Sequence, residues 1–366
     1  MRSTILTVLA CAVLALGLGA APAAAETGWR VAHTSPGFPQ DDFGDIAATG
    51  PDDAWAVGSG PCCGEPGEPQ KISRWDGTAW RDVAAPAPPG TTSYASLTHV
   101  GASSPRNAWV FGIDGNGLTY GHRWDGTAWR TTAFEEYAWI HDAAVTGPRS
   151  AWVVGTRPAA EGDEPVSRRW DGERWTVAPM PATAQAVSDP PGGRPWAIGQ
   201  AADRSVVAMR WTGSAWRTVR LPEPQLPPDV FALPGDILAL APDDIWASAV
   251  LGKDEGVWPG SVLWHWNGRR WRQVRIDAPQ DSLERLASDG RGGLWIASTN
   301  VHGSAYLLHY SEGRVTREPA PLGDGTAASV RAIVRVPGTR TLLAAGLLHG
   351  DNSGAWAATV WRYGGQ

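Results

Sequence analysis

The sequence has little cysteine and none of the short motifs that mark common enzyme classes. It contains 3 cysteines in 366 residues, and two of them, Cys62 and Cys63, are adjacent. Because neighbouring Cα atoms lie ~3.8 Å apart, a disulfide between this pair would close a strained small ring rather than staple distant segments. No C-x-x-C, H-E-x-x-H, phosphate-loop or G-x-S-x-G pattern occurs. The sequence therefore offers no motif for catalysis by these routes, and we expect no cofactor.

Long apolar runs are also absent beyond the first residues. Arg2, the apolar segment 5–18 and the small residues 23–25 follow the order of a secretion signal, so we assign residues 1–25 to a signal peptide. The longest later run, residues 342–348, is far shorter than the ~20 residues that a membrane helix needs. The formal net charge of −6 disfavours nucleic acid and anionic lipid as partners. We expect a secreted, extracellular monomer that is not inserted in a membrane.

Tryptophan, glycine and proline are abundant instead, with 22, 44 and 30 copies. The 43% hydrophobic and 19% charged residues are an ordinary globular balance. A unit made of x-W-x-x-G, a variable stretch and R-W-D-G-x-x-W-R recurs seven times. Its first aromatic position recurs every 43 to 54 residues, at Trp55, Trp109, Trp152, Trp196, Trp246, Trp295 and, in the seventh copy, Leu343. A period of ~40–50 residues is typical of four-stranded propeller blades, so we predict an all-β, seven-bladed β-propeller over residues 26–366.

The second half of each unit has the chemistry of a β-hairpin, and the two chain ends share one such hairpin. Asp76-Gly77 is a dipeptide that tolerates positive φ in a tight turn, and Trp75 and Trp80 flank it. The last residues, 362–366, match only the first half of this hairpin, and residues 27–33 match the missing half. We therefore predict that the N-terminal strand completes the last blade and closes the ring, which removes an open sheet edge.

The W-x-V…R-W-D-G-x-x-W signature, seen in Trp55 and in residues 74–80, resembles the repeats of secreted bacterial propellers and of tectonin-type lectin propellers. It is similar, less closely, to the Asp-box hairpin of sialidases, although Asp76 here directly precedes Gly77. The resemblance covers residues 26–366. It implies the propeller fold and, through the lectins, a carbohydrate-binding function.

Most of the tryptophans need no functional explanation, because 17 of the 22 occupy positions that recur from blade to blade and are expected to fill the core. Other aromatic residues fall in or near loops that we place on one face of the propeller. Their rings could stack on sugars or could simply pin the loops. These candidate rim residues are Tyr94, Tyr120, Tyr137, Trp139, Trp258, Tyr306 and Trp356.

A second set of candidates comes from aligning the first strand of every blade. One position is polar in five copies, and a shift of one or two residues adds Gln185 and Arg331. Each of these residues precedes an apolar one, which predicts a ring of polar side chains near the mouth of the central channel. Its carboxylates could bind Ca²⁺, could act as acid and base, or could line a water-filled channel. The ring consists of Asp45, His99, Asp142, Gln185, Asp236, Arg285 and Arg331.

Three functions remain open on the sequence alone. The first is a non-enzymatic propeller that binds extracellular carbohydrate or protein through its loop-rich face. The second is a propeller glycan hydrolase or lyase that uses channel-mouth carboxylates such as Asp142. The third is a scaffold for protein interactions. The absence of a catalytic motif favours binding. Cys62 and Cys63, which could form a vicinal disulfide, are expected to act as a rigid loop platform.

Overall fold

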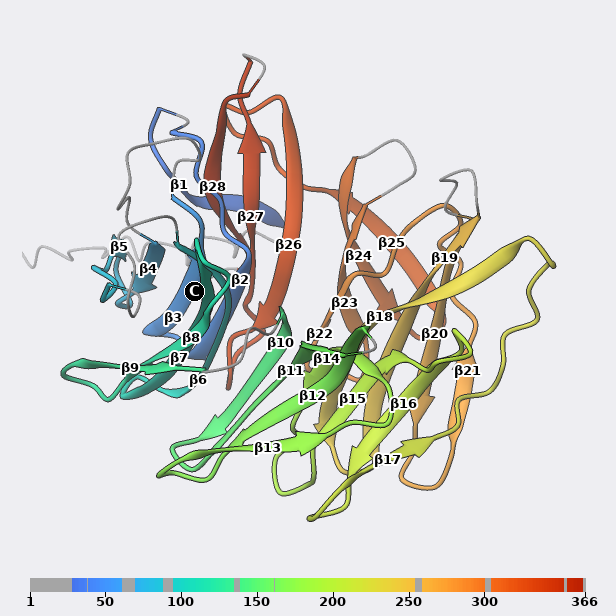
Figure 1. The fold of residues 1–366 in the computed structure, drawn as a ribbon. Coiled ribbons are helices and arrows are strands. Elements are labelled where there is room, and N and C mark those ends of the chain that lie inside the picture. Colours follow the sequence, from blue (N-terminus) through green and yellow to red (C-terminus); the bar gives the residue numbers. More distant parts are fainter. Residues whose placement is uncertain are drawn as a thin grey trace, which may run out of the picture.

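The computed structural model describes residues 28–37, 39–60, 70–87, 95–134, 139–160, 162–253, 259–299, 304–351 and 354–364. These residues form seven four-stranded antiparallel sheets, which are the blades of a propeller (Figure 1). The all-β, seven-bladed prediction is therefore confirmed. Among the described residues, no helix is long and apolar enough to cross a membrane.

The first six blades each consist of four consecutive strands, with the first strand of each blade contacting the first strand of the next. Blade 1 contains β2 (Asp45–Gly50), β3 (Asp53–Gly58), β4 (Lys71–Trp75) and β5 (Trp80–Asp82). Blade 2 contains β6 (Ala95–Ser104), β7 (Asn107–Asp114), β8 (Thr119–Trp124) and β9 (Trp129–Ala133). Blade 3 contains β10 (Trp139–Gly147), β11 (Ser150–Ala159), β12 (Gly162–Trp170) and β13 (Trp175–Pro179).

The second half of the ring follows the same plan. Blade 4 contains β14 (Thr183–Ser188), β15 (Trp196–Gln200), β16 (Val206–Trp211) and β17 (Trp216–Val219). Blade 5 contains β18 (Val230–Ala241), β19 (Asp244–Lys253), β20 (Gly260–Trp266) and β21 (Trp271–Val274). Blade 6 contains β22 (Arg285–Ser288), β23 (Leu294–Thr299), β24 (Ala305–Ser311) and β25 (Arg314–Pro319).

Blade 7 joins the two ends of the chain. It contains β26 (Ala327–Arg335), β27 (Leu342–His349), β28 (Trp356–Tyr363) and, as its fourth strand, β1 (Trp29–Thr34). β1 pairs antiparallel with β28 (Figure 1), and Trp29 is the register partner of Tyr363. β26 contacts β2 of blade 1, so the predicted closure of the ring by the N-terminal strand is confirmed.

The turn between the third and fourth strands forms as the sequence predicts. In blade 1, Gly77 has a φ of 91°, and the Asp76 carboxylate accepts hydrogen bonds from the backbone N–H groups of Thr78 and Ala79, both at 2.9 Å. The hydrogen bond from Arg81, together with these turn bonds, lowers the pKa of Asp76. The equivalent glycines, Gly126, Gly172 and Gly268, also have positive φ, which is why the Asp-Gly or Asn-Gly pair recurs.

The tryptophan of the second strand packs between neighbouring blades. In blade 3, the ring centroid of Trp152 lies 5.0 Å from that of Trp211 and 5.4 Å from that of Trp216, the two hairpin tryptophans of blade 4. The guanidinium of Arg169, which is the register partner of Trp152, lies 5.7 Å from its ring centroid. All six second-strand tryptophans are buried: Trp55, Trp109, Trp152, Trp196, Trp246 and Trp295. They form the core between blades, as predicted.

The glycine of the W-x-x-G motif lies where the second strand passes very close to the first. A Cβ atom on Gly155 would overlap the carbonyl oxygen of Trp139, and one on Gly346 would overlap that of Ser329. Only glycine allows this approach between the two backbones. The motif therefore encodes both the core tryptophan and the tight pairing beside it.

Candidate functional site

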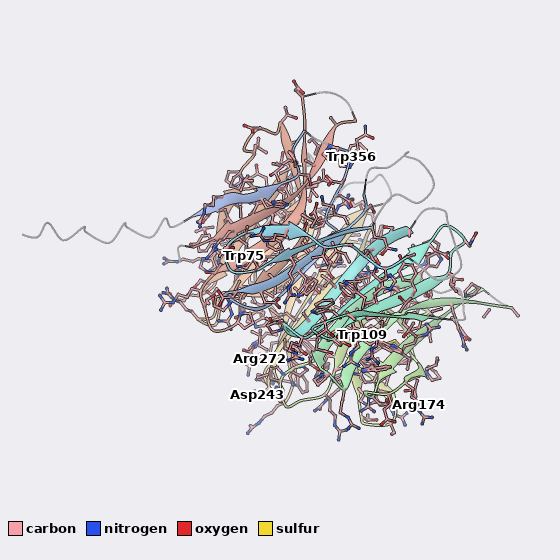
Figure 2. The ribbon with its side chains drawn as sticks, turned by 90° about the vertical axis from the view of Figure 1, so that its left-hand side faces the viewer. Trp75, Trp109, Arg174, Asp243, Arg272 and Trp356 are labelled. Carbon is pink, nitrogen blue, oxygen red and sulfur yellow. The ribbon has the colours of Figure 1, made fainter. Side chains whose placement is uncertain are left out.

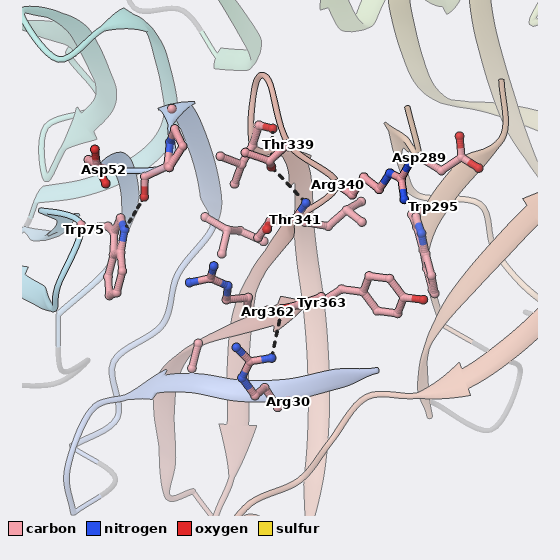
Figure 3. Close-up of a pocket in the computed structure, with 18 of the residues that line it drawn as sticks. Arg30, Asp52, Trp75, Asp289, Trp295, Thr339, Arg340, Thr341, Arg362 and Tyr363 are labelled. Carbon is pink, nitrogen blue, oxygen red and sulfur yellow. Dashed lines mark hydrogen bonds between the residues drawn. The ribbon is translucent and has the colours of Figure 1, made fainter. Parts of the chain in front are cut away.

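A large cavity lies at blade 7, on the face of the propeller that carries the hairpin turns. Its volume is about 1160 Å³, and ligand pockets commonly span ~300–1,000 Å³. Its walls come from blades 6, 7 and 1, and Figure 3 shows Trp75 and Asp52 on one side, Trp295 and Tyr363 on the other, and Arg362 between them. The cavity is thus built where the chain closes the ring.

The cavity exists because the repeat loses its tryptophan at this junction. Leu343 of β27 occupies the position that holds tryptophan in the other six blades, and it shares an apolar cluster with Trp75 and Trp80 of blade 1. Leucine is too small to fill the space that an indole fills at the other junctions. The rings of Trp75 and Trp80 therefore line the cavity. The Trp75 Nε1–H donates to the carbonyl oxygen of Pro51 at 2.8 Å, which fixes this ring (Figure 3).

Arginine and threonine side chains supply the polar part of the cavity. Arg30 donates from Nη1 to the carbonyl oxygen of Gly364 at 3.1 Å. Burial and the positive charge of Arg30 lower the pKa of Arg362. The lining also includes Thr339, Arg340 and Thr341. Apolar ring faces beside several hydrogen-bond donors are complementary to a sugar, which presents C–H faces and hydroxyl groups.

The predicted polar ring lies elsewhere, at the starts of the inner strands and so at the end of the channel away from the hairpin turns. Its three aspartates come from alternate blades, and each bridges to the next blade. Asp45 accepts a hydrogen bond from the backbone N–H of Val100 at 2.9 Å, Asp142 from that of Val187 at 2.8 Å, and Asp236 from that of Leu286 at 2.7 Å. These carboxylates therefore join the inner strands of blades 1 and 2, 3 and 4, and 5 and 6.

His99 and Arg285 lie among these carboxylates. The Nδ1 atom of His99 is 3.9 Å from Oδ2 of Asp45 and 3.8 Å from Oδ1 of Asp142. Burial alone would lower the pKa of Arg285, but the charges of Asp236 and the other two aspartates raise it. The structure therefore brings five of the predicted ring residues together at the channel.

Burial dominates the ionisation of the ring residues. It raises the pKa of Asp142 to about 7 and that of Asp45 to about 6, although the charge of Arg285 opposes both shifts. Burial also raises the pKa of Asp236. Burial and the charge of Arg285 lower the pKa of His99 to about 3, so this imidazole is neutral in the folded protein near neutral pH. The hydrolase or lyase hypothesis for these carboxylates stays a prediction, which assays of turnover would test.

Gln185 and Arg331, the other two predicted ring members, lie at the rim of the channel mouth. With Arg285 they line a cavity of about 360 Å³, and Arg331 forms an ion pair with Asp42. Both residues sit at β-bulges in their strands. Among the described residues, no group of three or more His, Cys, Asp or Glu side chains is placed to hold a metal ion.

Three of the candidate rim aromatics, Trp139, Tyr306 and Trp356, lie at the starts of first or third strands, on the face opposite the hairpin turns. Trp139 is 60% exposed at the start of β10. Tyr306 and Trp356 are half-buried in β24 and β28, and Trp356 lies apart from Trp75 in Figure 2. The placement of Tyr120 in the rim is wrong, because its side chain is fully buried in β8 and its hydroxyl accepts a hydrogen bond from Gln70. Tyr94, Tyr137, Trp258 and the pair Cys62-Cys63 lie outside the described residues.

Comparison with known proteins shows similarity at the level of the fold. No model of a known protein family matches the sequence, and no curated protein sequence matches it. The β-propeller domain of Cps50 (Swd1) from Myceliophthora thermophila is 10% identical, with a TM-score of 0.55, over 91% of this chain and 99% of that one. The α-L-arabinofuranosidase Arb93A from Fusarium graminearum is 10% identical, with a TM-score of 0.52, over 91% and 97%. The SapL1 lectin, solved with α-methyl fucoside, is 12% identical, with a TM-score of 0.48, over 77% and 96%.

The residues of the blade 7 cavity were not among the sequence-based candidates. The signal that could have found them was Leu343, the only second-strand position of the seven without tryptophan. A missing core residue at one junction predicts unfilled space there. A second signal of this kind is the hairpin turn that blade 7 lacks, because its third and fourth strands are the two ends of the chain.

Proposed function

We propose that the protein is a secreted, non-enzymatic propeller that binds extracellular carbohydrate in the cavity of blade 7. The observation that carries this proposal is the junction at Leu343, where the rings of Trp75 and Trp80 line a cavity instead of packing on a tryptophan. An indole face is the surface on which the C–H face of a pyranose lies flat, and the arginine donors and the Thr341 hydroxyl beside it match sugar hydroxyls.

This site differs from the loop-rich face that the sequence favours. The cavity lies among the hairpin turns, whereas Trp139 marks the opposite face, at the start of an inner strand. A concave site with two aromatic side chains on its walls offers more contact to a sugar than a single exposed ring. The proposed ligand is therefore still carbohydrate, as the sequence suggests, but the proposed binding site is the blade 7 cavity and not the loop-rich face.

Binding of the protein to a panel of neutral and acidic glycans, followed by titration of the best ligand, tests this proposal. We expect saturable binding to one class of sugar, and a loss of about tenfold or more in affinity for Trp75→Ala. Trp139→Ala is the matched control, since it removes an exposed indole outside the cavity, and its affinity should stay within about twofold of wild type. Thermal unfolding of both variants checks that the fold persists.

Two results would overturn the proposal. If Trp139→Ala abolishes binding and Trp75→Ala does not, the ligand binds at the loop-rich face. If the wild type binds no glycan in the panel, carbohydrate is not the ligand, and a protein partner becomes the hypothesis to test by capture experiments.

A further inference from the structure

Arg362 has lost the aromatic partner that its equivalents keep. In every other blade an arginine or histidine of the third strand faces the second-strand tryptophan as its register partner. The arginine guanidinium lies over the tryptophan ring in the blades that have arginine: its distance from the ring centroid is 4.4 Å for Arg74 and Trp55, 5.9 Å for Arg123 and Trp109, and 5.4 Å for Arg210 and Trp196. In the two blades that have histidine, the imidazole stacks on the tryptophan. The ring centroids of His265 and Trp246 are 4.2 Å apart, and those of His309 and Trp295 are 4.7 Å apart. Arg362 faces Leu343 instead, so the second strand of blade 7 offers no ring to its guanidinium.

Arg362 also lacks the carboxylate that supports its equivalent in blade 1. There, Arg74 donates from Nε to Asp53 at 2.8 Å, two residues before the repeat tryptophan. In blade 7 the same position is Thr341. The Nε atom of Arg362 is buried and has no hydrogen-bond partner among the described residues. An unpaired donor on a charged group in such a place disfavours the fold unless something else satisfies it.

The cavity gathers further positive charge around Arg362. Arg30, Arg291 and Arg340 also line it, and the acidic lining residues are Asp52 and Asp289. One of these carboxylates is already engaged, because Asp289 accepts a hydrogen bond from His309 at 3.0 Å. The chain as a whole has a net charge of −6, so this positive cavity runs against the charge of the rest of the protein. A local field of this sign attracts an anion.

We propose, building on the carbohydrate-binding function above, that the sugar held in this cavity carries an anionic group, a carboxylate or a sulfate. The geometry assigns the anion to Arg362, with Arg340 at the exposed edge of the cavity and the hydroxyl groups of Thr339 and Thr341 beside it (Figure 3). A guanidinium presents a planar fork of N–H donors, which binds a carboxylate or sulfate through two parallel hydrogen bonds. The rings of Trp75 and Trp80 then hold the sugar that bears this group.

A purely structural role for Arg362 predicts that its removal would destabilise the ligand-free protein, whereas a ligand-binding role does not. Burial and the charge of Arg30 disfavour the charged form of Arg362, so its removal is not expected to weaken the folded state. An anionic ligand would satisfy the buried donor and offset the repulsion between the two arginines. Arg362→Gln should therefore lower affinity while leaving the melting temperature of the ligand-free protein unchanged or raised.

The test compares matched acidic and neutral sugars by titration calorimetry. The probes are oligogalacturonate, its fully methyl-esterified form, a sulfated galactan and the desulfated galactan. We expect at least one acidic probe to bind about tenfold or more tightly than its neutral match, and the two acidic arms distinguish a carboxylate from a sulfate. Arg362→Gln should lose that preference. The control, Arg174→Gln, alters an exposed arginine on a hairpin turn far from Trp75 (Figure 2) and should bind as wild type does.

The outcomes separate this inference from the function on which it rests. Equal affinity for the acidic and neutral forms, or an unchanged preference in Arg362→Gln, would overturn the anionic ligand and leave carbohydrate binding in place. Absence of binding to every probe and to the wider glycan panel would overturn both. A loss of preference in Arg174→Gln equal to that in Arg362→Gln would also overturn the assignment, because it would mean a nonspecific charge effect.

Discussion

Leu343 and Arg362 face each other across β27 and β28, at the register position where every other blade pairs a tryptophan with an arginine or histidine. This single departure from the repeat leaves space at the junction of blades 7 and 1 and leaves a guanidinium without a ring. Blade 7 also lacks the hairpin turn between its third and fourth strands, because the two chain ends pair there. The cavity and its aromatic wall follow from the loss of the tryptophan, and arginines of blades 6 and 7 supply the positive charge.

Gly155→Ala tests the account of the W-x-x-G motif. A Cβ atom there would overlap the carbonyl oxygen of Trp139, and backbone cannot move away without breaking the β10–β11 pairing. We expect a loss of about 3 kcal/mol or more in the free energy of unfolding, measured by urea denaturation. Gly147→Ala is the control, since the nearest atom to its Cβ would be 4.0 Å away. Equal stability of the two variants would contradict the account.

Trp29→Ala tests the closure of the ring. Trp29 lies in β1, and its ring centroid is 5.4 Å from that of Trp295 in blade 6, so it joins the N-terminal strand to a neighbouring blade. Removing this buried indole should cost about 3–5 kcal/mol of unfolding free energy. The same substitution at Trp139, which is 60% exposed, should change stability by less than about 0.5 kcal/mol. Similar melting temperatures for Trp29→Ala and Trp139→Ala would mean that closure of the ring contributes little to stability.

Asp142→Asn tests the ionisation of the channel ring. The pKa of Asp142 is about 7 in the fold against 3.8 ordinarily, so between these values the folded state binds more protons than the unfolded state. The contribution of Asp142 to stability therefore falls as pH rises through this window. Asparagine has no such titration and can still accept the N–H of Val187. We expect the melting temperature of the variant, relative to wild type, to rise between pH 4 and pH 8.

A control with the opposite sign accompanies that measurement. The pKa of Asp76 is lowered by its hydrogen bonds to Arg81 and to its own turn, so its contribution to stability is present at neutral pH and is lost as pH falls below about 4. Asp76→Asn should be less stable than wild type at pH 7, and this difference should shrink in acid. A constant difference across pH for either variant would contradict the assigned ionisation.

The fold could be predicted from the sequence because its signals recur in every blade. Each Asp-Gly or Asn-Gly turn and each core tryptophan repeats, and the half-units at the two ends, around Trp29 and Tyr363, point to closure. The channel ring could also be located by alignment, but Gln185 and Arg331 are shifted to bulges in β14 and β26. His99 and Asp142 directly follow equivalent bulges in β6 and β10, so Gln185 and Arg331, which are themselves the bulged residues, lie one position out of register with these ring members.

The candidate site was harder to predict, because it depends on the tryptophan that is missing at position 343 and on the hairpin turn that blade 7 lacks. Tyr120 looks like a loop residue in the sequence, yet β8 begins at Thr119 and buries its ring. The cavity depends on the size difference between Leu343 and a tryptophan, and on two chain ends that lie far apart in sequence. Reasoning from repeated motifs explains what the blades share, whereas this site arises where one blade differs.

Leu343→Trp, titrated with the glycan class that the wild type binds, tests whether the cavity at Leu343 is the sugar-binding site. The new indole restores the repeat, should pack on Trp75 and Trp80 as Trp152 packs on Trp211 and Trp216, and should offer its face to Arg362. The control is Leu343→Met, which conserves volume and should keep both stability and binding. For Leu343→Trp we expect a melting temperature at or above that of wild type together with a loss of about tenfold or more in affinity. Wild-type affinity in a stably folded Leu343→Trp variant would contradict this assignment.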